Sequence, residues 1–343
     1  MLNTSWLRAL PRHVFGHGRR ASVQVGVCLS SSDMVAARVR RDPDGSYAIE
    51  RVVAAQLKTQ RDDQAVAQLI GTGILRNAQV MLVLGSENYS TYPLPCPSVP
   101  SAEVREALRW KLREVLPYGP EDAVIDFVQL ARADSSAAET LFAVAAPRRS
   151  VAHAVAPFDA AGIEVQAVDI AEMAQRNVLE QLPGAEAGRA LLGLDAKSAL
   201  LTVVEQDVLC FARRIQIPRS LATEDEEDPE HVAVRIATQV QRSLEVVERQ
   251  SGLAPIRTVW IGPHPYAALI ARCTGERTGM ECLQLDLQAE LRFEGSAFEL
   301  AAEQAPAALI AIGAALRDEQ TAAGSRSGLE SPALSWLSRL NVA

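Results

Sequence analysis

One pattern of strands and turns occurs twice in this sequence, in residues 22–53 and again in residues 190–217. Each copy begins with an apolar run that contains one glycine, Gly26 or Gly193, and a short polar turn and two further β-rich runs follow. This order predicts a three-stranded meander in each copy. Because such a sheet must cover one apolar face, the repeat predicts two lobes of similar build that face each other.

The composition predicts a soluble globular protein. Of the 343 residues, 48% are hydrophobic and 22% are charged, which is enough to give two or three subdomains their own cores. The formal net charge is -8, and the chain has no dense block of Lys and Arg. Nucleic acid is therefore not expected as a partner, because contacts to phosphates supply most of the affinity for it.

The cysteines and histidines do not have the spacing of metal ligands. The five cysteines contain no C-x-x-C pair and the five histidines are scattered, so we expect no metal site. Cys28 and Cys210 fall within predicted strands, where small buried thiols are common. The lack of a disulfide framework fits a reducing cytoplasm.

No run of the sequence has the length and hydrophobicity of a transmembrane helix. Residues 305–316, one of the longest apolar runs, fall short of the about 20 residues that a span needs. Residues 1–20 have no apolar signal core, so we do not expect export. They combine apolar side chains with four arginines, which leaves two interpretations, a disordered basic leader or a weak contact with an anionic membrane surface.

A second subdomain is expected after the first meander. Four prolines in residues 92–100 mark an extended crossing, and a helix is predicted directly after it, over residues 101–116. Trp110 lies off the apolar stripe of this helix. It either packs on a neighbouring subdomain, which we favour, or faces a partner. The stripe itself consists of Val104, Ala107, Leu108, Leu112 and Val115.

The remaining chain is expected to alternate helices and strands, with the acidic run at 224–228 as a solvated loop. Further strands are predicted at 80–85, 123–130, 140–146, 164–169 and 257–262, and further helices at 62–76, 149–161, 170–181, 231–251, 266–273 and 305–317. The predicted division is a leader (1–21), a first lobe (22–92 and 166–189) with an inserted α/β subdomain (93–165), a second lobe (190–304), a closing helix (305–317), and a linker with an apolar tail (318–343).

The order of these elements resembles the actin-like fold, and at finer grain the pilus-assembly PilM proteins, particularly those of the MshI type. The motifs that carry the resemblance lie at residues 94–110, 115–118, 124–127, 143–147, 161–163, 242–244 and 311–317, within a similar stretch from 22 to 318. The resemblance implies an α/β, actin-like (FtsA/PilM-like) two-lobed fold with a small α/β subdomain inserted in the first lobe. It also implies a role in the biogenesis of a type IV pilus of the MSHA type.

Relatives of this kind bind ATP between two hairpin turns and a third, glycine-rich turn. Active members carry a D-x-G pattern in the first two turns, because the acid positions magnesium and the glycine lets the backbone approach a phosphate. In the first turn of this sequence, Cys28 stands where the acid is expected and Ser30 where the glycine is expected. In the second turn, Gly193 and Asp195 occupy each other's expected positions. The third turn keeps only Gly262, and the proline that follows has no N–H donor.

Nucleotide binding is therefore expected to be lost or weak, and we predict a non-enzyme without a cofactor or a metal. Ser31, Ser32 and Ser198 keep hydroxyl groups in the turns, and Lys197 is the one feature that could still attract an anion. Two interpretations remain open. The turns are hairpin connections only, or they retain ATP/Mg binding without efficient hydrolysis.

The resemblance implies a non-catalytic scaffold in a pilus assembly platform at the cytoplasmic face of the inner membrane. Its expected partners are other platform components and a PilN-like bitopic membrane protein, whose short N-terminal segment would dock in a groove between the first lobe and the inserted subdomain. Trp110 and Phe127 are the candidates for the wall of that groove. The alternatives are a working actin-superfamily ATPase of pilus or type II secretion assembly, and the cytoplasmic domain of a type II secretion system.

Overall fold

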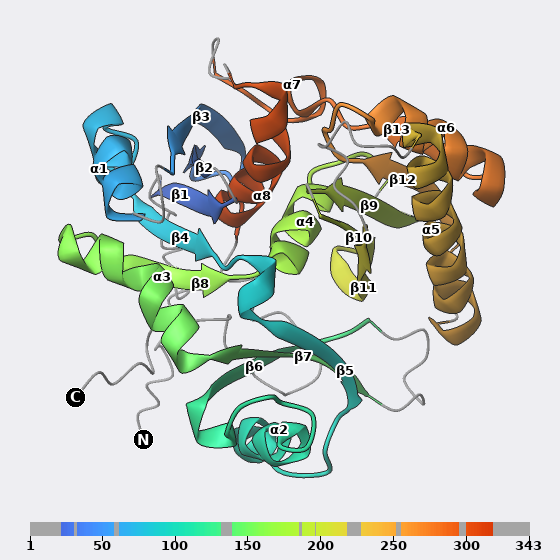
Figure 1. The fold of residues 1–343 in the computed structure, drawn as a ribbon, viewed down its shortest axis with the longest axis horizontal. Coiled ribbons are helices and arrows are strands. Elements are labelled where there is room, and N and C mark those ends of the chain that lie inside the picture. Colours follow the sequence, from blue (N-terminus) through green and yellow to red (C-terminus); the bar gives the residue numbers. More distant parts are fainter. Residues whose placement is uncertain are drawn as a thin grey trace, which may run out of the picture.

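The computed structural model describes residues 22–30, 33–57, 62–131, 139–184, 187–195, 197–217, 228–251, 255–294 and 300–317. The predicted leader, the linker and tail, most of the acidic run, and both Ser31 and Ser32 lie outside the described residues. The described part forms two lobes side by side, with a smaller subdomain below them in the view of Figure 1.

The first lobe is built on a five-stranded sheet with the strand order β3-β2-β1-β4-β8. The first three strands form an antiparallel meander, whereas β4 pairs in parallel with both β1 and β8. The strands are β1 (Ser22–Leu29), β2 (Asp33–Arg41), β3 (Tyr47–Gln56), β4 (Gln79–Val83) and β8 (Val165–Asp169).

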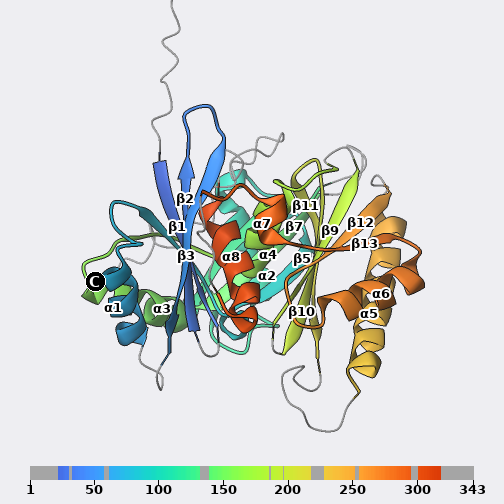
Figure 2. The ribbon, with the colours of Figure 1, turned by 90° about the horizontal axis from the view of Figure 1, so that it is seen from above.

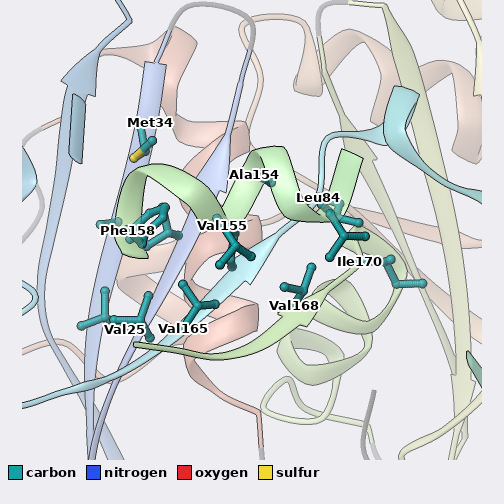
Figure 3. Packing of buried hydrophobic residues seen from close by; sticks show 14 of the residues in the cluster. Val25, Met34, Leu84, Ala154, Val155, Phe158, Val165, Val168 and Ile170 are labelled. Atoms are coloured by element: carbon teal, nitrogen blue, oxygen red, sulfur yellow. The ribbon is translucent and has the colours of Figure 1, made fainter. Parts of the chain in front are cut away.

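Two helices, α1 (Asp62–Thr72) and α3 (Arg148–Ala160), cover one face of this sheet. Side chains of α3, among them Val155 and Phe158, pack with Val25 of β1 and Val165 of β8 in one core cluster (Figure 3). Because side chains alternate along a strand, Gly26 and Cys28 lie on the opposite face of β1.

The second lobe has the same arrangement of strands and covering helices as the first. Its five-stranded sheet has the order β11-β10-β9-β12-β13, and helices α5 (Pro229–Ser251) and α6 (Ala267–Thr278) cover its outer face (Figure 2). The duplicated meander and the two similar lobes predicted from the sequence are thus confirmed. The strands are β9 (Gly188–Leu194), β10 (Ser198–Glu205), β11 (Val208–Gln216), β12 (Ile256–Ile261) and β13 (Glu281–Gln284).

Two helices, α4 (Ala171–Leu179) and α8 (Ala305–Ala315), lie between the two sheets (Figure 2). A Cβ atom on Gly26 would lie 2.7 Å from the backbone nitrogen of Ala315 in α8, and one on Gly313 would lie 2.6 Å from the carbonyl carbon of Ala174 in α4. Only glycine permits these two backbone approaches, so the central helices are held at close packing distance. No helix in the described ranges is long and apolar enough to cross a membrane.

The subdomain below the lobes is a three-stranded sheet with the order β5-β7-β6 that packs on α2 (Val104–Leu112). Its strands are β5 (Ser90–Pro95), β6 (Ala123–Gln129) and β7 (Thr140–Pro147). Short helices at Ser86–Asn88, Ser101–Glu103, Pro120–Asp122, Leu287–Glu290 (α7) and Ala302–Gln304 connect the larger elements.

Three details of this subdomain differ from the sequence-based expectations. The helix ends at Leu112, so Val115 leaves the apolar stripe and is 56% exposed. Trp110 is 60% exposed, so the favoured prediction that it packs on a neighbouring subdomain is wrong. The helix predicted at 149–161 was assigned to the insertion, but α3 packs with the sheet of the first lobe.

The close approach at Gly26 gives a prediction about stability. Gly26→Ala should lower the free energy of unfolding by about 2 kcal/mol or more, because the new Cβ meets backbone atoms of α8 that cannot move independently. Gly71→Ala is the matched control, since Gly71 lies in α1 with nothing within 4 Å of the added Cβ. The control should be more stable than the parent by about 0.5–1 kcal/mol. Urea unfolding measures both changes, and equal values would contradict the assigned contact.

Candidate functional site

Three turns contain the residues that the sequence predicts to form degenerate nucleotide-binding turns, and we call them the interlobe turns. The first joins β1 to β2 at residues 30–33, the second joins β9 to β10 at 195–198, and the third joins β12 to α6 at 262–266. Burial raises the pKa of the Cys28 thiol, with smaller contributions from the carboxylates of Asp195 and Glu87, to about 12 in all. Burial lowers the pKa of His264, and Asp195 opposes this shift. The charge of Asp195 thus acts on groups near the other two turns.

The second turn is organised around the carboxylate of Asp195. Its Oδ1 accepts the backbone N–H groups of Lys197 and Ser198, both at 2.7 Å, and its Oδ2 accepts the Ser198 hydroxyl at 2.6 Å. Arg214 of β11 donates to the Ser198 hydroxyl at 3.3 Å and lies 3.8 Å from Asp195. The donors that a phosphate would use at this turn are therefore already bound to an anion that the chain supplies itself.

The first turn is also closed by its own groups. The backbone N–H of Ser30 donates to the carbonyl of Asp33 at 2.8 Å, and the N–H of Asp33 donates to the Ser30 hydroxyl at 3.0 Å. Gln304, at the start of α8, donates its amide to Asp33 at 3.1 Å. The described donors of this turn thus bind acceptors of the turn, and its acidic side chain is held by the closing helix.

The third turn follows β12 and uses its donors within the second lobe. The N–H of Gly262 donates to the carbonyl of Leu192 in β9 at 2.9 Å. The N–H of Tyr266 donates to Nδ1 of His264 at 3.2 Å, and Pro263 has no N–H. This turn therefore extends the pairing of the sheet into the loop.

The glycines of the meanders serve packing in this structure. A Cβ on Gly193 would lie 2.9 Å from the side-chain amide carbon of Gln175, which comes from α4 and is 1% exposed. The buried amide of Gln175 is also 2.8 Å from the hydroxyl of Thr202 in β10. The space that a metal-positioning carboxylate would need at position 193 is thus filled by Gln175.

Sequence reasoning missed Gln175 and Arg214. Neither residue stands in a recognisable motif. Gln175 reaches Gly193 and Thr202, in the strands beside the second turn, from α4, and Arg214 reaches Ser198 from the neighbouring strand β11. The spacing of Asp195 and Ser198, by contrast, is typical of an aspartate that binds the amides of its own turn, and it could have been recognised. Lys197 is exposed, and in the described part of the chain no group of three or more His, Cys, Asp or Glu side chains is placed to hold a metal ion.

The two residues predicted to line a partner groove lie in different environments. The Trp110 ring is exposed on α2, with the Arg113 guanidinium 5.8 Å from its centroid. Phe127 is 4% exposed and belongs to the core between α2 and β6, where Arg105 lies over its ring. Phe127 therefore does not line the surface of the predicted partner groove, because its ring is covered by helix α2 of the same subdomain.

Replacing Asp195 by Ala should destabilise the second turn. The loss should be about 1 kcal/mol of unfolding free energy, because two backbone N–H groups and one hydroxyl lose their acceptor. Lys197→Ala is the neighbouring control: it removes an exposed charge but keeps the backbone donor, and should change stability by less than about 0.5 kcal/mol. Urea unfolding of the two variants measures this difference. An Asp195→Ala variant as stable as its parent would contradict the assigned role.

The comparisons with known proteins agree with this architecture. Residues 97–225 match the family model described as Type IV pilus assembly protein PilM. No curated protein sequence matches the chain. Among solved structures, the chain is similar to a "PilM-PilN type IV pilus biogenesis complex", with a TM-score of 0.66 and 19% identity over 85% of this chain and 97% of that chain.

Two further structures show weaker likeness. The cytoplasmic domain of EpsL, an inner membrane component of the type II secretion system of Vibrio cholerae, gives a TM-score of 0.48 and 14% identity over 86% of this chain and 95% of its own. A Bacteroides thetaiotaomicron protein with an actin-like ATPase fold and unknown function gives a TM-score of 0.46 and 8% identity over 80% of this chain and 93% of its own. By its match to the PilM-PilN structure, the chain has the actin-like fold predicted from its sequence. The PilM family model matches the segment that runs from its inserted subdomain into its second lobe.

Proposed function

We propose that this protein is a PilM-like, non-catalytic scaffold of a type IV pilus assembly platform. The observation that carries the proposal is the match of residues 97–225 to the PilM family model. The fold supports it, because 85% of the chain aligns with 97% of a chain in the structure titled as a PilM-PilN complex. At the finer level, we propose an MSHA-type pilus, on the sequence motifs given above.

The absence of catalysis is part of the proposal, and the geometry of the interlobe turns supports it. Asp195 binds the amides of Lys197 and Ser198 that would otherwise face a phosphate. A nucleotide would have to displace this carboxylate or sit beside it, and either costs free energy through lost hydrogen bonds or charge repulsion. Gln175 fills the space beside Gly193 where an acid could position magnesium. We therefore assign no cofactor, metal or enzymatic activity to the turns.

The proposed partner is the short N-terminal segment of a PilN-like bitopic membrane protein. A scaffold that binds such a segment would lie at the cytoplasmic face of the inner membrane, together with other platform components. Trp110 is the anchor we assign on this protein, since exposed tryptophans often carry much of the binding energy in protein interfaces.

The absence of a nucleotide site can be tested by thermal unfolding with Mg-ATP. A ligand at roughly 50 times its Kd stabilises the folded state by about 2 kcal/mol, which raises Tm by several degrees in a protein of this size. We expect no rise at 5 mM Mg-ATP compared with magnesium alone. A rise of several degrees would instead support the rival function, an ATP-binding ATPase of pilus or type II secretion assembly.

The partner can be tested with the N-terminal peptide of the membrane protein encoded by the next gene. We expect calorimetric binding to the full chain, and about 30-fold weaker binding to Trp110→Ala, as for an interface hot spot. Ile70→Ala is the matched control, because Ile70 is 43% exposed on α1, away from the inserted subdomain. No binding to the parent protein would contradict the proposed partner. Equal binding to the parent and to Trp110→Ala would contradict only the position of the site.

A further inference from the structure

A group of buried polar side chains joins the two lobes through α4. Tyr89 follows β4 of the first lobe, Glu172 lies in the first turn of α4, and Arg214 lies on β11 of the second lobe. The Tyr89 hydroxyl donates to Oε2 of Glu172 at 2.6 Å. The Arg214 guanidinium donates to Oε1 of Glu172 at 3.1 Å and to the Tyr89 oxygen at 3.0 Å. One buried carboxylate therefore binds groups from both lobes at once.

Because Glu172 is buried, its carboxylate requires a paired cation. The side chain of Glu172 is 3% exposed and that of Arg214 is 19% exposed. Burial and the charge of Glu172 raise the pKa of Tyr89 well above its usual range, so its hydroxyl stays protonated and can donate. If Arg214 were lost while the packing stayed in place, Glu172 would be an unpaired buried charge, which is strongly unfavourable.

Arg214 also connects this group to the second interlobe turn. The guanidinium that binds Glu172 donates through its other terminal nitrogen to the Ser198 hydroxyl, which in turn donates to Asp195. A continuous set of contacts thus runs from Tyr89 in the first lobe to the turn of the second lobe where the fold would otherwise hold a ligand.

The tip of the β10–β11 hairpin is held by further contacts. Arg176 of α4 donates to the carbonyl of Asp207 at 2.8 Å, and the buried Arg189 pairs with the Asp207 carboxylate at 2.6 Å. Leu209, the second residue of β11, is 2% exposed and lies in the core cluster of the first lobe. Its carbonyl accepts the N–H of Ala131, which follows β6 of the inserted subdomain, at 2.8 Å. Strand β11 therefore contacts α4, the first-lobe core and the inserted subdomain.

We propose that Tyr89, Glu172 and Arg214, together with the β10–β11 hairpin, form an interlobe lock that holds the lobes and the inserted subdomain at fixed relative positions without a nucleotide. The inference goes beyond the scaffold function, because it concerns the rigidity of this chain whatever partner it binds. In chemical terms, the ion pair between Glu172 and Arg214 bridges the two lobes.

The lock can be tested by hydrogen exchange of the full chain, read by mass spectrometry with and without 5 mM Mg-ATP. Arg214→Met should accelerate exchange on the order of tenfold in residues 86–92, which lead from the first lobe into β5, and at the start of α4, since it removes charged hydrogen bonds to both. The matched control is Arg213→Met, the neighbouring arginine on β11, which donates to Ser243 within the second lobe. The control should leave these segments at the parent's rates, and Mg-ATP should not change the exchange of the parent.

Tyr89→Phe keeps the ring in the first-lobe core and removes only the hydroxyl that donates to Glu172. This variant tests the interlobe lock if Arg214→Met does not fold. It should accelerate exchange at the start of α4 by about threefold, as expected for one lost hydrogen bond. Unchanged exchange in both variants would overturn the lock. An equal acceleration in Arg213→Met would also overturn it, because the effect would then be a general loosening of β11. Slower exchange of these segments with Mg-ATP would overturn its independence from nucleotide.

Discussion

The backbone contact of α8 with β1 and with α4 is the constraint on which the rest of this structure depends. Gly26 and Gly313 permit it, because any side chain at either position would overlap a neighbouring backbone. Since α4 leads from the first lobe into β9 of the second, its position against α8 decides where the second sheet begins. The same helix carries Glu172 and Gln175, so the ion pair between the lobes and the filled space beside Gly193 both follow from this packing.

The fold was largely predictable from local sequence, whereas the contacts between its parts were not. The two meanders and the helix α5 follow from patterns of apolar residues within single elements, which the periodicities of sheet and helix predict. The packing of Trp110 on a neighbouring subdomain was predicted wrongly, because a residue off a stripe has no sequence signal for what lies opposite it. Phe127 was assigned wrongly because a strand pattern does not tell which face a helix will cover. Gln175 and Arg214 act across elements, and no local pattern marks such contacts.

The second interlobe turn is stabilised by a side chain of the turn itself. A turn whose amides converge needs an acceptor, and in this chain the Asp195 carboxylate supplies it. Because the acceptor is covalently part of the turn, ordering it costs far less entropy than capturing a free anion. The exchange of Gly193 and Asp195 relative to the expected pattern is therefore physically coherent: the glycine admits Gln175, and the aspartate closes the turn.

Rigidity connects the interlobe contacts to the proposed scaffold function. A surface that is already ordered loses less conformational entropy when a partner binds, so part of the interaction free energy is not spent on ordering it. In this chain, β11 joins the Arg214 network to the inserted subdomain through the contact between Leu209 and Ala131. The subdomain that carries Trp110 is consequently positioned by contacts to both lobes. In the proposed scaffold, the buried charges between the lobes would keep the surface around Trp110 in one orientation before a partner binds.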